Sequence, residues 1–308
     1  MIKRRRRGVT LIEVIVVISV LGVVMTLLMS ATAQVRHKAS QVQCQNNLRQ
    51  MSLSVNLYID VHGMIPRATN YNGYSAHVFL LPHLELSNLF SAINFNVSAH
   101  DNLVGSANST VNQYNISVFT CPSDYSSGST SDFQLSYPGS RGVEFRDYRD
   151  NGAFAYWSKN GVSSAQFLDG ASNTICFSEW RISKSITESN EKSSNVYNLG
   201  LEYSGRAKMK DFELRCSNIT NSTEVELLNM KGKNWLAGDY VSSFYNNNLT
   251  PGNPSCLSGG LIQEGAYTAG SWHNQAVNCA MVDGQVRLIR YSIDSKIWRA
   301  LGTRGESD

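Results

Sequence analysis

The chain has 308 residues, of which 42% are hydrophobic and 17% are charged, and its formal net charge is +3. Five of the 27 basic residues precede Val9, so 22 remain after that point against 24 acidic residues, a formal charge of −2. The excess of basic residues therefore belongs to the N-terminus, and it gives no support to nucleic-acid binding.

The N-terminus combines a basic leader with a long uncharged segment. Residues 1–8 read MIKRRRRG, and residues 14–33 contain no charged side chain. Twenty such residues in a helix span a hydrocarbon core of roughly 30 Å, and basic residues before the span stay on the cytoplasmic side. The pattern predicts one transmembrane helix with a cytoplasmic N-terminus and an exported C-terminal region.

The processing of this N-terminal region has three possible interpretations. An ordinary secretory signal is cut after its apolar core, and residues 30–33 (SATA) offer such a site. A membrane anchor that is never cut is the second alternative. The third is a cut between Gly8 and Val9, before the apolar segment. Glu13 lies at the edge of that segment, where a carboxylate is costly in lipid and so indicates a function.

Residues Gly8 to Glu13 read GVTLIE, and with the basic leader they resemble the type IV prepilin family. The resemblance implies cleavage after Gly8 and N-methylation of Val9 by prepilin peptidase. It also implies that the chain is held in the inner membrane and assembles there with other pilin subunits, either identical or different. Glu13 would then lie near the N-terminal amine of an adjacent subunit. The exported domain would then lie in the periplasm or, after assembly, at the cell surface. Val9 stands where the family usually has Phe.

The helical pattern continues beyond the apolar segment. Residues 34–62 contain neither proline nor glycine, and apolar side chains recur there at helical spacing. These are Val35, Val42, Leu48, Met51, Val55 and Tyr58. We expect one helix from about Thr10 to Asp60, ended by Gly63 and Pro66, whose second half packs on a globular domain.

Residues 63–308 are predicted to form that domain, rich in strands and loops, so that the fold class is α+β. The expected elements are a short helix within Phe79–Asn94, a strand at Ile116–Pro122, a turn and strand within Phe167–Trp180, and a hairpin of 277–282 with 285–289. Asp283-Gly284 between the last two strands favours a type I′ turn. Residues 183–260 are polar and irregular, and they predict an insertion.

Short motifs spread along the chain resemble a large family of bacterial pilin-like proteins with a C-terminal His-x9-Asp-Gly motif, related to the pseudopilins of type II secretion. They include CQNNLRQ at 44–50, LLPHLE at 80–85, CPSD at 121–124 and WRAL at 298–301. The motif residues are Cys121, Asp169, Gly170, Asn173, Glu179, His273, Asp283 and Gly284. The resemblance implies an N-methylated helix carrying a β-rich domain. His83 stands where that family usually has Tyr.

Six cysteines in an exported domain favour disulfides, and they allow fifteen pairings. They are Cys44, Cys121, Cys176, Cys216, Cys256 and Cys279. We expect most of them to be paired, with Cys44 joining the long helix to the domain. No Cys-x-x-Cys or His-Cys cluster has the spacing of a zinc site, so zinc is not expected.

Asp169, Glu179 and Asp283 allow two interpretations. Their hard oxygen ligands suit calcium, although no EF-hand-like loop is present. In the alternative, Asp169 and Asp283 shape their Asp-Gly turns and His273 is a buried, hydrogen-bonded side chain. The second interpretation predicts no cofactor, and we favour it.

The leading functional hypothesis is a structural pilin or pseudopilin subunit. The alternative is a membrane-anchored surface protein that binds polysaccharide or another envelope component. Aromatic side chains available for such binding would be Tyr71, Tyr74, Trp157 and Trp235. No hydrolase or phosphate-loop motif is present, so an enzyme is not expected.

Overall fold

The computed structural model describes residues 8–101, 107–112, 114–124, 134–144, 151–156, 161–183, 192–200, 206–219, 226–228, 230–259, 261–273 and 275–305. Most of the predicted leader, residues 1–7, lies outside these ranges. The chain divides into two compact units, Met1–Val42 and Gln43–Asp308. The second unit therefore includes the C-terminal part of the long helix.

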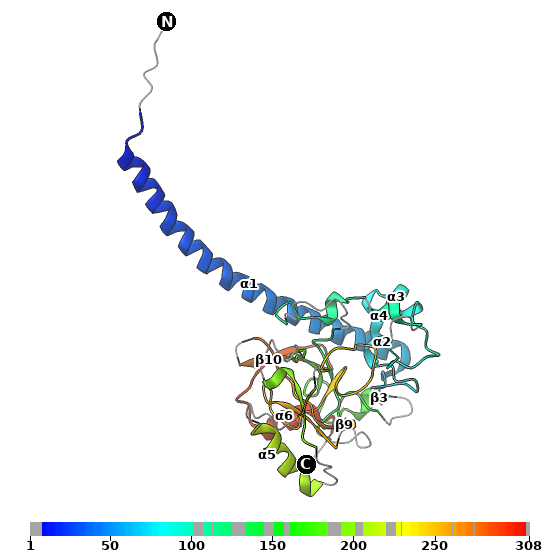
Figure 1. The fold of residues 1–308 in the computed structure, drawn as a ribbon. Helices are drawn as coiled ribbons and strands as arrows, with labels where there is room; N and C mark the ends of the chain where they lie inside the picture. The colour runs from blue at the N-terminus through cyan, green and yellow to red at the C-terminus, as the bar shows by residue number, and fades with distance from the viewer. Residues whose placement is uncertain are drawn as a thin grey trace. The chain divides into compact units, whose positions relative to one another are not determined.

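Helix α1 spans Leu11–His62, within two residues of the predicted ends (Figure 1). By length and composition it can cross a membrane, since an 18-residue stretch of it has a mean hydropathy of 2.8. The helix ends at Gly63, whose φ of +76° is the left-handed conformation that commonly follows a helix. The N–H of Gly63 donates to Ile59 O at 2.7 Å.

The buried stripe of α1 is shorter than predicted. Leu48, Met51 and Val55 are fully buried and follow helical spacing, as expected. Val35 and Val42, which belong to the first unit, are 66% and 54% exposed in the single chain. Periodicity identifies the apolar face of a helix, but it does not say where along the helix a domain begins to cover that face.

Short helices replace two predicted elements. The expected helix within Phe79–Asn94 is three pieces, α2 (Ala76–Leu80), η1 (Leu81–Leu84) and α3 (Ser87–Ser91). Pro82 lacks the N–H that a continuous helix would need, and Glu85 ends η1 with a φ of +63°. The strand predicted at Ile116–Pro122 is wrong, because η2 (Ser117–Phe119) occupies it. Phe119 N donates to Ile116 O at 2.9 Å, within the segment itself.

The main sheet has five strands in the order β11-β10-β4-β2-β7. The strands are β2 (Gly139–Ser140), β4 (Ile175–Ser178), β7 (Phe244–Tyr245), β10 (Ala276–Met281) and β11 (Val286–Arg290). Neighbours are antiparallel except β2 and β7. The structure confirms the predicted strand after Asp169-Gly170 and the predicted C-terminal hairpin, in which Val277 pairs with Ile289.

The hairpin turn differs from the predicted type. A type I′ turn needs positive φ at both central residues, but at this turn only Gly284 has one, +93°. Gly284 N donates to Met281 O at 3.0 Å, and Met281 N donates to Gln285 O at 2.8 Å. This is a type I turn followed by a left-handed glycine, the three-residue connection that also suits strand twist.

The described residues of the predicted insertion, 183–260, are not irregular. They contribute β7 to the main sheet and three strands to a second sheet ordered β6-β5-β8-β9. The segment contains β5 (Val196–Asn198), β6 (Glu226–Leu228), β8 (Ser255–Ser258) and α5 (Arg206–Ser217), and β9 (Leu261–Ala266), which completes the second sheet, follows it. A second small core lies here, crossed by the Cys216–Cys256 disulfide. The prediction failed because many of these strands are too short to show a period.

Smaller elements complete the described part of the chain. They are β1 (Met64–Ile65), which pairs with β3 (Val162–Ser163), α4 (Ser109–Asn112), η4 (Ser164–Gln166), η5 (Lys192–Ser194) and α6 (Ser295–Gly302). Asp294 caps α6 by accepting from the N–H of Lys296 at 2.8 Å. Figure 1 shows α6 beside α5, and Arg299 of α6 forms an ion pair with Glu213 of α5 at 2.6 Å.

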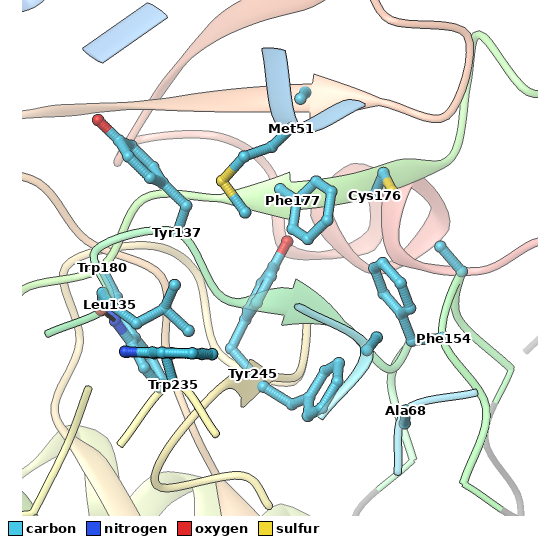
Figure 2. Close-up of a cluster of buried hydrophobic side chains, with 14 of the residues drawn as sticks. Met51, Ala68, Leu135, Tyr137, Phe154, Cys176, Phe177, Trp180, Trp235 and Tyr245 are labelled. Atoms are coloured by element: carbon cyan, nitrogen blue, oxygen red, sulfur yellow. Dashed lines mark hydrogen bonds between the residues drawn. The ribbon is translucent and has the colours of Figure 1, made fainter. Parts of the chain in front are cut away.

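The main core joins α1 to the five-stranded sheet. Figure 2 shows Met51 of α1 beside Phe177 of β4, with Trp235 and Tyr245 from the 183–260 segment in the same cluster. All four side chains are fully buried. The core therefore depends on the segment that the sequence pattern treats as peripheral.

Candidate functional site

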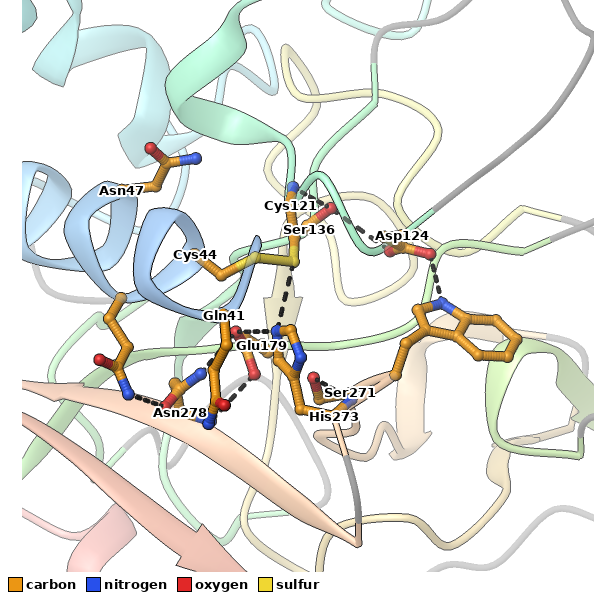
Figure 3. Close-up of polar contacts among 12 residues, drawn as sticks. Gln41, Cys44, Asn47, Cys121, Asp124, Ser136, Glu179, Ser271, His273 and Asn278 are labelled. Atoms are coloured by element: carbon orange, nitrogen blue, oxygen red, sulfur yellow. Dashed lines mark hydrogen bonds and ion pairs between the residues drawn. A yellow bond between two sulfur atoms is a disulfide. The ribbon is translucent and has the colours of Figure 1, made fainter. Parts of the chain in front are cut away.

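A disulfide joins α1 to the loop after η2 (Figure 3). It links Cys44 to Cys121, and both side chains are buried, with exposed fractions of 0% and 6%. Asn47, one helical turn beyond Cys44, donates from Nδ2 to the carbonyl oxygens of Ser117 (3.3 Å) and Thr120 (3.0 Å). The loop is thus held to the helix at two points, and the prediction that Cys44 joins helix and domain is confirmed.

A histidine and a glutamate lie against this disulfide. His273 Nε2 is 3.7 Å from Cys121 Sγ and 3.7 Å from Glu179 Oε1. Glu179 follows β4 and His273 precedes β10, and each side chain is only 2% exposed. The pairing of β4 with β10 therefore brings the two side chains to the same buried place beside α1.

Asn278 of β10 fixes the Glu179 carboxylate. Its backbone N–H donates to Oε2 and its side-chain Nδ2 donates to Oε1, both at 2.9 Å. Gln45, next to Cys44 on α1, donates from Nε2 to Asn278 Oδ1 at 3.0 Å. A continuous chain of hydrogen bonds therefore runs from the helix to the carboxylate.

Burial dominates the acidity of Glu179. Removal from water raises the pKa of this carboxyl to about 7, although hydrogen bonds from Asn278 and Ser271 act in the opposite direction. Burial thus weakens the acidity of this carboxyl far beyond that of an exposed glutamate.

Asp124 links the two loops that carry Cys121 and His273. Its Oδ1 accepts from the indole N–H of Trp272 at 2.7 Å, and Oδ2 accepts from Ser136 Oγ at 3.3 Å. Ser136 Oγ in turn accepts from the N–H of Cys121 at 3.0 Å. These contacts form a second layer around the disulfide and limit its movement.

Cys44, Cys121, Glu179 and His273 are the one group of three or more potential metal ligands within the part of the chain that the structure describes. Their ligand atoms all lie within 4.8 Å of one another. With the disulfide formed, the two sulfurs are bonded to each other and cannot act as thiolate ligands. We define these four side chains as the disulfide–histidine centre.

Two family models match the chain. One, described as the prokaryotic N-terminal methylation motif, matches residues 3–29, and the other, described as a protein of unknown function (DUF1559), matches residues 33–296.

The chain belongs to the DUF1559 family.

Its methylation motif and its long apolar helix make this DUF1559 protein a type IV pilin-like precursor, as predicted. No curated protein and no solved structure matches it.

The predicted motif residues of this DUF1559 protein separate into two places. Cys121, Glu179 and His273 meet in the disulfide–histidine centre. The others lie in two neighbouring turns, where Asp283 N donates to Ala171 O at 3.2 Å. These residues are Asp169, Gly170, Asn173, Asp283 and Gly284.

The three calcium candidates do not form a site. Asp169 and Asp283 are exposed in those turns, whereas Glu179 is buried in the disulfide–histidine centre. Asp283 Oδ1 accepts from Gln285 N at 2.9 Å, which is the turn-shaping role expected of it. At the other turn the main chain of Asp169 makes the contact, since Asp169 O accepts from Asn173 Nδ2 at 3.0 Å. The three carboxylates are not brought together, because β4 carries Glu179 away from the turn that precedes the strand.

Sequence reasoning assigned no role to Asn278 or Gln45. The available signal was a polar residue within the apolar run VNCAM, at 277–281. Asn278 is fully buried, and a buried amide in a strand needs partners. Gln45 was part of a recognised motif, but only the fold shows that it reaches Asn278.

Helix α1 begins with a capping box that involves the predicted processing residues. Thr10 N and Thr10 Oγ1 donate to Glu13 Oε2 at 2.7 and 3.0 Å, and Glu13 N donates to Thr10 Oγ1 at 3.3 Å. Gly8 and Val9 precede this box and are exposed. Glu13 therefore has a local role at the helix end besides the one that the prepilin resemblance implies.

Two of the four aromatic side chains proposed for sugar binding are unsuited to it. Tyr74 and Trp235 are fully buried, whereas Tyr71 is fully exposed. Trp157 lies outside the described residues. Burial removes two of the four candidates from any surface site.

Proposed function

We propose that this chain is a structural pilin or pseudopilin subunit, not a catalyst. Prepilin peptidase cuts it after Gly8 and methylates Val9, and the subunit is held in the inner membrane with its domain in the periplasm. It then assembles with other pilin-like subunits into a filament or a secretion pseudopilus through the apolar half of α1.

The apolar surface of α1 carries this proposal. Side chains on different sides of the helix, among them Val14, Val16 and Val17, are 50% to 56% exposed in the single chain. A helix that is apolar all round is stable only in lipid or among other apolar elements. Lipid covers this surface before assembly, and copies of the helix cover it afterwards.

Glu13 gives the assembly its register. Cleavage after Gly8 leaves Val9 with a free ammonium, and a carboxylate in an apolar bundle needs such a positive partner. The capping box satisfies Glu13 within its own chain, but hydrogen bonds from Thr10 do not neutralise its charge. The N-terminal amine of an adjacent subunit supplies the positive charge that neutralises it.

Two substitutions separate the capping role of Glu13 from its charge. Glu13→Gln keeps a side chain that completes a capping box and loses the charge, whereas Glu13→Ala loses both. In the native host we expect all three chains to mature to N-methyl-Val9 by mass spectrometry. Removing one partner of a buried ion pair costs about 3–5 kcal/mol, so we expect both variants to assemble more than tenfold less than wild type in sheared filament or cross-linked fractions.

Three results would count against the proposal. A wild-type chain that starts at Met1, or beyond residue 33, excludes prepilin processing. Equal assembly of all three chains refutes a register role for Glu13. Normal assembly of Glu13→Gln with failure of Glu13→Ala reduces that role to helix capping.

A further inference from the structure

The disulfide–histidine centre holds a ligand set that suits a transition metal once its sulfurs are reduced. Two thiolates, an imidazole and a carboxylate are typical of zinc, which binds four such ligands as a tetrahedron. Spacing in the sequence argues against zinc, because the four residues lie far apart along the chain. The fold removes that objection by placing all four ligand atoms within 4.8 Å of one another.

The distances fit a tetrahedral site. Zinc–ligand bonds of about 2.0–2.3 Å place the ligand atoms of a tetrahedron about 3.3–3.8 Å apart. His273 Nε2 is already 3.7 Å from Cys121 Sγ and 3.7 Å from Glu179 Oε1. The two sulfurs, 2.05 Å apart, are too close because they are covalently bonded. The Cα atoms of Cys44 and Cys121 are 5.1 Å apart, so side-chain rotation can separate the reduced thiols.

The surroundings hold these side chains as a metal site requires. Asn278 donates two hydrogen bonds to the Glu179 carboxylate, at 2.9 Å each, and sets its orientation. Ser136 Oγ accepts from the N–H of Cys121 at 3.0 Å. Such second-layer contacts orient the ligands in metal sites. The four side chains are buried, which excludes competing water.

We propose that the dithiol form of this chain binds one Zn²⁺ through Cys44, Cys121, His273 and Glu179, and that disulfide formation expels the ion. The thiols lose their protons when the metal binds. An external disulfide then takes two electrons from the two thiolates and two protons from the solvent and becomes two thiols, while the Cys44–Cys121 bond forms and Zn²⁺ leaves. The newly exported chain, which still carries both thiols, is the form that binds the metal.

The test uses the full-length chain in detergent, reduced without oxygen by a phosphine. Zn²⁺ stoichiometry is measured by native mass spectrometry, and Co²⁺ serves as a probe because thiolate ligation gives it charge-transfer absorption. We expect one metal ion per reduced chain and none per oxidised chain. We expect His273→Ala to weaken binding by about 100-fold or more and Asn278→Ala by about 10–100-fold.

The remaining cysteines provide matched controls. Cys176→Ser, Cys279→Ser and the double variant Cys216→Ser/Cys256→Ser remove thiols outside the centre, and we expect each to bind Co²⁺ as wild type does. If any of these variants abolishes Co²⁺ binding, the metal is bound elsewhere and the proposal is overturned. So does a reduced wild-type chain that binds no metal, or a His273→Ala chain with wild-type affinity.

Folding gives a second readout. If reduction unfolds the chain, we expect Zn²⁺ added during refolding to restore the circular dichroism of wild type but not of His273→Ala. We also expect saturating Zn²⁺ to slow formation of the Cys44–Cys121 disulfide and to leave the Cys216–Cys256 pair unaffected, as followed by peptide mapping. A reduced chain that stays unfolded with Zn²⁺, or equal oxidation rates at both pairs, contradicts the proposal.

Discussion

Lys231 is a fully buried lysine. Its ammonium donates to Ser193 O, Ser255 Oγ and Thr268 O, each at 3.0 Å, and lies 5.3 Å from the centre of the Trp180 ring. Burial first, and then the charge of the nearby Arg181, lower the pKa of Lys231, whereas Asp124 acts in the opposite direction, and together they leave it at about 7. Three oxygen acceptors satisfy the ammonium, but they do not offset its removal from water.

This lowered pKa predicts a pH-dependent stability. Between about pH 7 and pH 10.5 the unfolded chain keeps a proton on Lys231 that the folded chain has lost. The free energy of unfolding should therefore rise with pH between 7.5 and 9, by at most about 1.4 kcal/mol per pH unit. Urea unfolding at several pH values measures this slope, and Lys231→Met should remove most of it. Equal slopes in both chains would assign the effect to other groups.

At the scale of single elements, the hairpin β10–β11 is the clearest case of local chemistry determining local structure. Its register follows from alternating side chains, and its connection follows from one glycine. Gly284 has a φ of +93°, and a Cβ built there would have no neighbour nearer than 3.9 Å. The requirement for glycine is therefore conformational and not steric.

Substitution at Gly284 tests this requirement. Gly284→Ala should lower the free energy of unfolding by about 1 kcal/mol, because a residue with a Cβ is strained in the left-handed region. Gly284→Asn should recover part of the loss, since Asn adopts that region more readily. Gly270 is the matched control, because its φ is not left-handed and a Cβ there meets nothing nearer than 3.8 Å. Urea unfolding measures both free energies, and equal losses for Gly284→Ala and Gly270→Ala would refute the explanation.

At the scale of the whole molecule, two disulfides stabilise two cores. Cys44–Cys121 bridges residues 77 apart in sequence and holds α1 to the main core, whereas Cys216–Cys256 bridges residues 40 apart in the second core. Longer closed loops remove more freedom from the unfolded chain. The chain-entropy model assigns roughly 4 kcal/mol to each bond, slightly more to the first.

Paired substitutions measure these contributions. Cys44→Ala/Cys121→Ala should lose about 4 kcal/mol or more, because it also leaves the buried Glu179 and His273 beside a cavity. Cys216→Ala/Cys256→Ala should lose somewhat less. Cys176 and Cys279 close no loop, so Cys176→Ala and Cys279→Ala should lower the free energy of unfolding far less. Urea unfolding without reductant provides the values, and a larger loss in the second pair than in the first would contradict this order.

The sequence by itself determined the features whose causes lie within a few residues. Helix α1 and the C-terminal hairpin follow from periods of 3.6 and 2, and the methylation motif is a continuous segment. Local patterns failed where elements were too short to show a period, as at Ile116–Pro122 and over most of 183–260. There the burial of Trp235 and Tyr245 in the main core is a long-range contact that local patterns do not express.

Only the tertiary structure decided how the motif residues are grouped. The sequence singled out Cys44, Cys121, Glu179 and His273 in different motifs, and the spacing of its cysteines and histidines argued against zinc. The pairing of β4 with β10 beside α1 brought them together and left Asp169 and Asp283 in exposed turns. The physical reason is that spacing along a chain limits distance only between near neighbours, whereas packing of the core sets the distance between residues far apart.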